Sequence, residues 1–381
     1  MDLTIAVVVY AVGEVAVRRA YGPEPWFLYT QHLTGGHEFV LNSHGLRERE
    51  FPVARPPAEM RVLCVGNSST WGAGVGLEDT YPKQLERMLN QGDEHGPNFV
   101  INAAGQGRLG FGGQGLAGLS AQAILRYVCT EGLLFSPSVV VYGFSPHIIG
   151  HTVLAAAADT VSERATVAPW SDVEPAGGWP ARVIAHSKKV YAQLSALSWF
   201  FPYLDVAIST SLYRCGVVRD EIGRDRGATP AYAFDVPGVD YGRIDEAYGA
   251  LARTLASLNV AVRQGGGTLI VLNIPSRFEV SDLPRDNIQN TDVSKARIDP
   301  TERLRAICAA QGLPFVDMRV RFRAARQEMI EGARPWDNLY TYDYTHLSPE
   351  GHRLVAEQLM EVLRTQDRLA SMRRAAAGLW P

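Results

Sequence analysis

Short apolar runs recur along the chain from residue 61 onward. Each is three to six residues long and closes on glycine or a polar residue, which is typical of strands buried on both faces of a parallel sheet. The runs cover Arg61–Gly66, Phe99–Asn102, Val139–Tyr142, Thr268–Asn273 and Phe315–Asp317. They predict the strands of the core.

Segments with apolar positions every three or four residues separate these runs and predict helices. The first follows Thr80, whose hydroxyl suits an N-cap, with Pro82 in the first turn. The others are expected at Ala117–Leu134, Ile244–Gln264, Thr301–Gln311 and Glu350–Arg364. Strands that alternate with helices predict an α/β architecture with a parallel sheet.

Three regions interrupt or precede this alternation. Residues 1–22 form an apolar helix, for which two readings stay open: a docked amphipathic helix, or a short membrane anchor or its remnant through residues 3–17. Residues 23–60 are rich in Pro and Gly and predict an irregular arm that wraps onto the main domain at 61–381. The segment from about residue 150 to about residue 245 is predicted to be an insertion or lid within that domain.

Composition narrows the function classes. The 381 residues carry 37 basic and 40 acidic side chains, a formal net charge of -3, so we expect no nucleic-acid partner. The four cysteines are scattered, which predicts neither a disulfide framework nor a structural zinc site. His352 and Glu350 follow His346 closely, a grouping that could bind a metal. The segment Ser-Pro-Glu-Gly-His is equally an ordinary start of a helix. We expect no metal and no cofactor.

Two short segments near the ends of the chain carry candidate chemistry. Ser68 follows the first predicted strand, at the edge of a parallel sheet where ligands bind. His346 lies three residues after Asp343, close enough for the carboxylate to orient the imidazole, which could then deprotonate Ser68. Both segments also have an explanation without catalysis. Ser68 could belong to a capped turn after a strand, and Asp343 with His346 could belong to the capped start of a helix.

Together these segments resemble the SGNH/GDSL hydrolase superfamily. Its first sequence block is similar to Gly66-Asn67-Ser68-Ser69, its second to residues 102–107 and its last to residues 343–346. The run from Asn42 to Arg47, continuing through Thr70-Trp71-Gly72, is similar to a bacterial branch in which an N-terminal membrane segment is common.

The resemblance implies a fold and a set of roles. The fold would be a three-layer α/β/α flavodoxin-like sandwich with a mostly parallel sheet. Ser68 would be the nucleophile, His346 the base and Asp343 its orienting partner. The backbone N–H groups of Ser68 and Gly107 would stabilise the oxyanion, since a glycine lets an acyl oxygen approach the main chain.

The chain departs from the family pattern at two places. Asn67 stands where the first block usually has Asp, a nearly isosteric exchange that loses a charge. The third block, normally Gly-x-Asn-Asp, falls on Ser145-Pro146-His147-Ile148, so His147 takes the place of the usual Asn donor of the oxyanion hole. His147 could instead cap the segment that follows it.

The sequence therefore predicts a serine esterase that acts on a small-molecule or carbohydrate acyl ester. Two alternatives remain open at this point. One is an O-acyltransferase on a carbohydrate or small metabolite, and the other is a noncatalytic binding protein that kept the fold. The aromatic residues Trp199–Tyr203 could line an acyl pocket, contact a membrane or pack as part of a lid.

Overall fold

The computed structural model describes the central domain and the first helix. The described residues are 3–21, 41–56, 59–91, 98–104, 121–146, 149, 200, 241–280, 299–331, 339–341 and 346–376. The predicted insertion therefore lies outside the described residues, apart from residues 200 and 241–245.

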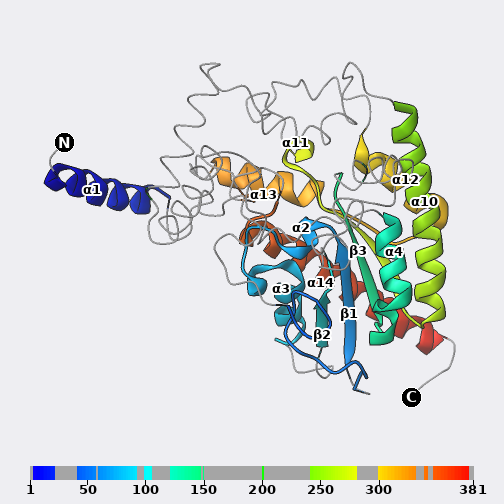
Figure 1. The fold of residues 1–381 in the computed structure, drawn as a ribbon. Coiled ribbons are helices and arrows are strands. Elements are labelled where there is room, and N and C mark those ends of the chain that lie inside the picture. The colour runs from blue at the N-terminus through cyan, green and yellow to red at the C-terminus, as the bar shows by residue number, and fades with distance from the viewer. Residues whose placement is uncertain are drawn as a thin grey trace, which may run out of the picture.

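A parallel sheet forms the centre of the domain (Figure 1). Its five described strands are β1 (Met60–Gly66), β2 (Asn98–Asn102), β3 (Val139–Phe144), β4 (Thr268–Asn273) and β5 (Phe315–Asp317). Their spatial order is β2-β1-β3-β4-β5, and every neighbouring pair is parallel. This is the strand order of flavodoxin-like sheets, so the predicted fold class is confirmed.

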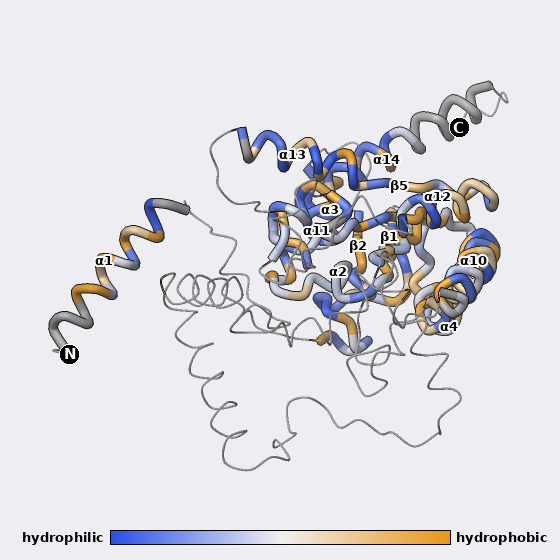
Figure 2. The backbone as a smooth tube through the Cα atoms, turned by 90° about the horizontal axis from the view of Figure 1, so that it is seen from above, coloured by the Kyte–Doolittle hydropathy of each residue, from blue (hydrophilic) through white to orange (hydrophobic). Residues whose placement is uncertain are grey.

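Helices cover both faces of the sheet, because side chains along each strand point alternately to opposite faces. On one face, Leu63 and Val65 of β1 belong to the same apolar cluster as residues of α4 (Ala121–Thr130), α10 (Tyr241–Gln264) and α12 (Pro300–Gln311). On the other face, Val62 and Cys64 pack with residues of α3, α13 and α14. These three helices span Tyr81–Leu89, Arg319–Glu331 and Pro349–Ala376. The result is the three-layer sandwich, seen from above in Figure 2.

Several helices differ from the prediction. The helix expected to run to Leu134 ends at Thr130 and is followed by the 3-10 turn η5 (Gly132–Phe135). At that turn the backbone of Gly132 lies against Leu63, where a Cβ would come within 2.8 Å of the leucine side chain. Helix α13 was not predicted, because its arginine-rich sequence has little apolar periodicity. Two four-residue helices, α2 (Ser68–Trp71) and α11 (Arg277–Val280), were too short to predict.

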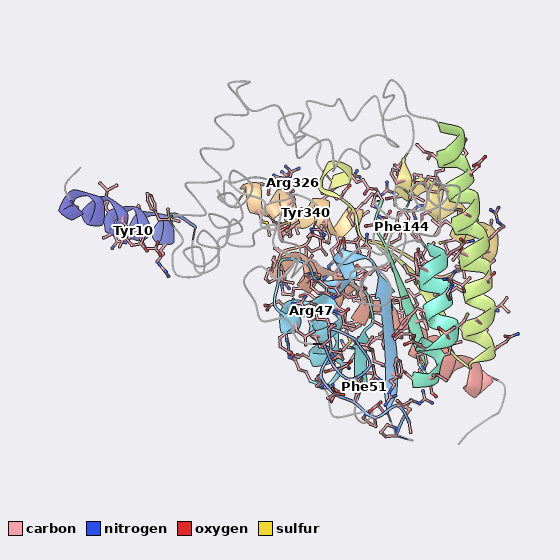
Figure 3. All side chains as sticks on the ribbon, viewed as in Figure 1. Tyr10, Arg47, Phe51, Phe144, Arg326 and Tyr340 are labelled. Atoms are coloured by element: carbon pink, nitrogen blue, oxygen red, sulfur yellow. The ribbon has the colours of Figure 1, made fainter. Side chains whose placement is uncertain are left out.

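The N-terminal helix α1 (Leu3–Tyr21) lies apart from the layers in both views. Tyr10, labelled in Figure 3, packs edge-to-face on Phe200 with ring centroids 6.2 Å apart. Glu14 accepts a hydrogen bond from the backbone N–H of Phe200 at 3.0 Å. None of the helices in the described part of the chain combines the length and the apolar character needed to cross a membrane.

The segment at residues 41–56 joins the core although it contains no helix or strand. Leu46 and Phe51 are buried in the same cluster as β1 and α4. Asn42 fixes the turn that leads into Leu46, since its Oδ1 accepts hydrogen bonds from the N–H groups of His44 and Leu46, both at 3.0 Å. The segment thus places the next residue, Arg47, against the loop that follows α2.

Candidate active site

Ser68 begins helix α2, directly after the carboxyl end of β1. In this sheet β2 lies on one side of β1 and β3 on the other, so the chain changes direction at this point. Such a topological switch point leaves a crevice outside the carboxyl ends of the strands, where α/β proteins bind their ligands. The sequence of β1 and the strand order together put the Ser68 hydroxyl at that crevice.

The closest described partner of the Ser68 hydroxyl is an imidazole from the far end of the chain. His346 Nε2 lies 2.7 Å from Ser68 Oγ, across 278 positions of sequence. Both side chains are half-buried, which leaves the pair open to solvent on one side. When Nε2 carries no proton, the serine hydroxyl donates to it, which is the ground-state geometry of a serine–histidine nucleophile.

The turn that carries His346 is held by backbone hydrogen bonds. The His346 carbonyl accepts from the N–H of Thr341 at 2.7 Å and from its hydroxyl at 3.2 Å. Tyr340 and Leu347 form an isolated antiparallel bridge on either side. These contacts fix the imidazole just ahead of α14, so the position of His346 depends on how α14 docks.

Asn67 organises the turn between β1 and α2. Its Oδ1 accepts from the Ser69 N–H at 3.1 Å, as an N-cap should. Its Nδ2 donates to the hydroxyl of Ser145, at the end of β3, at 2.5 Å. Both side chains are buried. The two departures from the family pattern at these positions therefore contact each other, and the amide supplies a donor that the usual carboxylate lacks.

Glycines let the two strand ends approach each other. A Cβ on Gly66, the last residue of β1, would lie 2.7 Å from the Gly143 carbonyl of β3 and would collide with the Thr70 hydroxyl. A Cβ on Gly143 would meet the same Thr70 side chain. Only glycine fits at these two positions, and the contact brings α2 down onto the sheet.

Arg47 binds the carboxyl end of α2 and the loop that follows it. Its guanidinium donates to the carbonyls of Trp71 at 3.0 Å, Gly72 at 2.7 Å and Val75 at 2.6 Å, and it lies 4.4 Å from the centre of the Trp71 ring. Figure 3 labels Arg47 in this region. Burial lowers the pKa of Arg47 to about 10, which still leaves it protonated at neutral pH. A positive charge beside the last carbonyls of a helix is the favourable end of the helix dipole.

The structure describes only some of the residues that the sequence predicts for the site. Ser68 and His346 are brought together, whereas Asp343, Gly107 and His147 lie outside the described residues. Of the aromatic stretch at 199–203 only Phe200 is described, and it packs against α1. Among the described residues, no three His, Cys, Asp or Glu side chains are grouped as metal ligands would be.

Thr80 is the N-cap residue of α3, as predicted, but its side chain makes no capping bond. Its hydroxyl donates to the Leu77 carbonyl at 2.7 Å instead of accepting from the helix. The first N–H of α3, that of Tyr81, instead donates to Nδ1 of His352 at 3.2 Å. Sequence spacing could not have revealed this contact, because the two residues are 271 positions apart.

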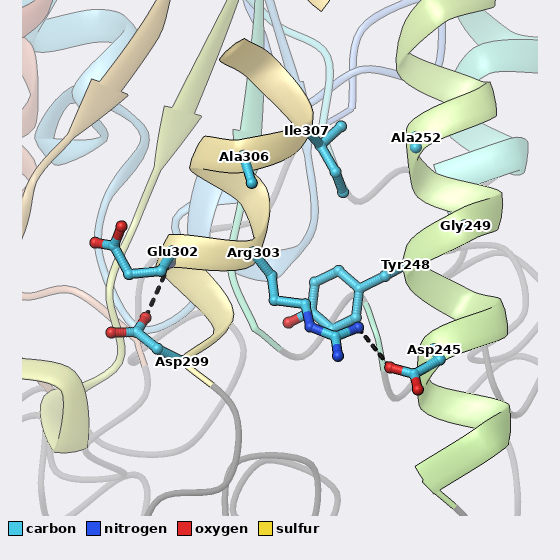
Figure 4. A pocket seen from close by; sticks show the side chains of 9 residues that line it. All are labelled: Asp245, Tyr248, Gly249, Ala252, Asp299, Glu302, Arg303, Ala306 and Ile307. Atoms are coloured by element: carbon cyan, nitrogen blue, oxygen red, sulfur yellow. Dashed lines mark hydrogen bonds and ion pairs between the residues drawn. The ribbon is translucent and has the colours of Figure 1, made fainter. Parts of the chain in front are cut away.

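An open pocket of about 580 Å³ lies elsewhere, between α10 and α12 (Figure 4). Arg303 crosses it, bonding to Asp245 at 2.5 Å and lying 5.2 Å from the centre of the Tyr248 ring. Neither Ser68 nor His346 lines this pocket. We therefore place the candidate active site at the switch point of the sheet and not here.

Comparisons with known proteins give distant structural likenesses. No family model and no curated protein matches the sequence. Solved structures similar to the chain include a gut microbial diltiazem-metabolizing enzyme, with 12% identity and a TM-score of 0.40 over 81% of this chain. The chain spans about half, 48%, of that protein's length. The acetyl xylan esterase AlAXEase is similar at 13% identity and TM-score 0.40, covering 80% of this chain and 99% of its own. A catalytic mutant of Axe2, an acetylxylan esterase from Geobacillus stearothermophilus, is similar at 11% identity and a TM-score of 0.38. The match covers 79% of this chain and 93% of that one.

Proposed function

We propose that this protein is a serine esterase that cleaves or transfers an acyl group through a covalent intermediate on Ser68. The observation that carries the proposal is the 2.7 Å approach of His346 Nε2 to Ser68 Oγ at the switch point of the sheet. The order of the sequence blocks, which resembles SGNH/GDSL hydrolases, supports the same assignment. Asp343, three residues before His346, is the proposed orienting carboxylate.

The first half of the proposed reaction forms the acyl-enzyme. His346 Nε2 takes the Ser68 proton as Oγ attacks the ester carbonyl carbon, and the carbonyl oxygen becomes an oxyanion. The oxyanion collapses and the carbon–oxygen bond to the alcohol breaks. His346 then returns the proton to the leaving alcohol. In the second half, water or a second alcohol gives its proton to His346 and attacks the acyl carbon, which forms a second oxyanion. This oxyanion collapses, the bond between the acyl carbon and Ser68 Oγ breaks, and His346 returns the proton to Oγ.

Stabilisation of the oxyanion requires hydrogen-bond donors at the same crevice. The Ser68 N–H is the first of α2 and has no acceptor within that helix, because helix ends leave such groups unpaired. Gly107 and His147 are proposed to supply the other donors. Their assignment rests on the sequence blocks alone.

The proposed substrate is a small-molecule or carbohydrate acyl ester. An O-acyltransferase is the same chemistry with a second alcohol in place of water. A noncatalytic binding protein is the alternative of a different class. The Ser68–His346 geometry favours catalysis over that alternative, because a binding protein has no need to place an imidazole nitrogen within hydrogen-bonding distance of a serine hydroxyl.

Turnover of p-nitrophenyl esters of increasing chain length, beside acetylated sugars, tests the proposal. We expect an initial burst of p-nitrophenol in the wild type where breakdown of the acyl-enzyme is the slower step, and none in Ser68→Ala. Adding a sugar alcohol separates the two catalytic options, since a transferase forms a new ester from it. Equal turnover in wild type and Ser68→Ala would end the proposal.

A further inference from the structure

His352 is a histidine for which the proposed reaction has no use, yet it is fully buried beside the candidate site. It lies in the second turn of α14, six residues after His346, and its exposed fraction is 0%. Its Nδ1 accepts the N–H of Tyr81 at 3.2 Å, and its ring stacks on that of Tyr81 at 6.0 Å between centroids. We propose that His352 is a positioning residue, whose neutral imidazole holds the His346 turn in place against the segment that carries Ser68.

The contacts on both sides of His352 lead to the two proposed catalytic residues. Tyr81 begins α3, and its hydroxyl lies 3.3 Å from that of Thr70, two residues after Ser68 in α2. On the opposite side, α14 begins three residues after His346. The pair of His352 and Tyr81 is thus a short buried link between segments that the sequence separates by more than 270 positions.

A second contact fixes the same junction. Gln84, one turn into α3, donates to the Pro349 carbonyl at the start of α14, at 3.0 Å. A Cβ on Gly351 would collide with the Leu339 carbonyl, so this glycine lets the turn that contains His346 pack directly on the first turn of α14. The start of α14 is therefore held on one side by α3 and on the other by the His346 turn.

The His352 ring is in the protonation state that lets Nδ1 accept the hydrogen bond from Tyr81. Burial lowers its pKa to about 3, with further lowering by the charges of Arg47 and His346. The ring is neutral at working pH, and because Nδ1 accepts from Tyr81, the proton is on Nε2. That Nε2 has no hydrogen-bond partner within the described structure.

An unpaired buried N–H lowers stability, so the imidazole is a costly way to fill this space. Leucine or phenylalanine would fill it without an unpaired donor. What neither of them offers is an acceptor for the first N–H of α3, which Thr80 leaves unsatisfied. The acceptor, and with it the fixed approach of α14 to α3, accounts for a histidine at this position.

The inference rests on the proposed function, since it gives His352 a part in the Ser68–His346 chemistry. Its test compares the rates at which a fluorophosphonate labels four proteins: wild type, His352→Leu, His352→Asn and Leu359→Ala. Asparagine places its Oδ1 where histidine has Nδ1, so it keeps the acceptor. Leu359 is buried two turns further along α14 and serves as a control for general destabilisation.

We expect His352→Leu to be labelled about 10- to 100-fold more slowly, because a small misplacement of the base has an effect of that size. His352→Asn should stay within about threefold of wild type, and Leu359→Ala should lose thermal stability but keep its labelling rate. Wild-type labelling of His352→Leu, or an equal loss in Leu359→Ala, would overturn the proposal.

A measurement that needs no activity separates this inference from the proposed function. Nitrogen NMR of the imidazole rings in the full chain reports which ring nitrogen carries the proton. We expect His352 to be neutral with Nδ1 unprotonated, and the Nδ1 signal to shift when Tyr81 is replaced. A proton on Nδ1 would overturn the positioning role even if Ser68 proves to be the nucleophile. Absence of labelling in the wild type would instead remove the proposed function.

Discussion

The Asn67 amide at the end of β1 donates to the Ser145 hydroxyl at the end of β3 at 2.5 Å, next to the proposed nucleophile. This bond spans the switch point, so it sets the distance between the Ser68 turn and the segment that follows β3. Both partners are buried, and the loss of the Ser145 hydroxyl removes the acceptor of this Asn67 N–H.

Ser145→Ala should therefore lower the free energy of unfolding by about 1–3 kcal/mol, the usual effect of an unpaired buried polar group. It should also lower kcat more than it raises KM, since the geometry of the reacting groups changes more than the ground-state contacts. Urea unfolding and steady-state kinetics measure the two effects. Asn67→Asp is the matched variant: it keeps the cap on Ser69 and can accept from the Ser145 hydroxyl, so we expect a milder effect. Unchanged stability and kcat in Ser145→Ala would contradict the role given to this bond.

Arg47→Leu should lower the free energy of unfolding by about 3–5 kcal/mol, because the carbonyls of Trp71, Gly72 and Val75 lose a buried charged donor. Arg47→Lys should recover only part of this, since one ammonium group cannot reproduce the planar fork. The neighbouring Arg49 is the control: it is half exposed, and Arg49→Leu should change stability by at most about 1 kcal/mol. Equal losses for the two leucine variants, measured by urea unfolding, would show that Arg47 has no special part.

Tyr81→Phe removes the hydroxyl that lies 3.3 Å from that of Thr70 and keeps the ring that stacks on His352. Because a buried neutral hydrogen bond contributes modestly, we expect a loss of about 0.5–1.5 kcal/mol in thermal or urea unfolding. Tyr81→Leu, which also removes the stacked ring, should lose clearly more. If the two variants are equally stable, the ring contact contributes nothing.

We expect Glu279 to make the free energy of unfolding depend on pH. It is buried, and its carboxylate accepts from the Thr301 hydroxyl at 2.5 Å and from the Ser276 N–H at 2.9 Å. Burial raises its pKa from 4.5 to about 7 in spite of these bonds. The folded state therefore binds a proton more tightly than the unfolded state. This carboxyl group stabilises the fold fully below about pH 4.5, and the contribution is lost as the pH rises through about 7.

Glu279→Gln should remove this contribution, which is on the order of 3 kcal/mol between the two limits. The measurement is the difference in unfolding free energy between about pH 5 and about pH 8, taken for wild type and variant. Comparison with the variant is needed because His352 has the opposite effect on stability. Its pKa is lowered in the folded protein, so its contribution to the free energy of unfolding falls as the pH falls. An identical pH difference in both proteins would contradict the raised pKa.

The strands could be predicted from the sequence because they are buried on both faces, and a continuous apolar run is a local signal. β4 and β5 were predicted with the bounds that the structure has. Helix α13 was missed because ion pairs hold it: Arg319 bonds to Asp299 and Asp317, from separate elements. Such partners are known only once the chain has folded.

The candidate site shows the same division. Ser68 and His346 could be predicted from the sequence, because a polar group after a strand and a histidine before a helix are local signals, and the resemblance pairs the two. The bond between Asn67 and Ser145, the clamp by Arg47 and the cap by His352 were not found, since each joins segments distant in sequence. Residues 42–47 stand out in the sequence only by their resemblance to the family, and the structure gives Arg47 of that run a physical role.

Mass spectrometry of the digested protein locates the adduct of a fluorophosphonate and tests directly whether Ser68 is the nucleophile. We expect one modified peptide, with the phosphonate on Ser68, and no adduct in Ser68→Ala or in His346→Ala at the same exposure. A wild-type adduct on a different residue, or Ser68 modified equally fast without His346, would contradict it.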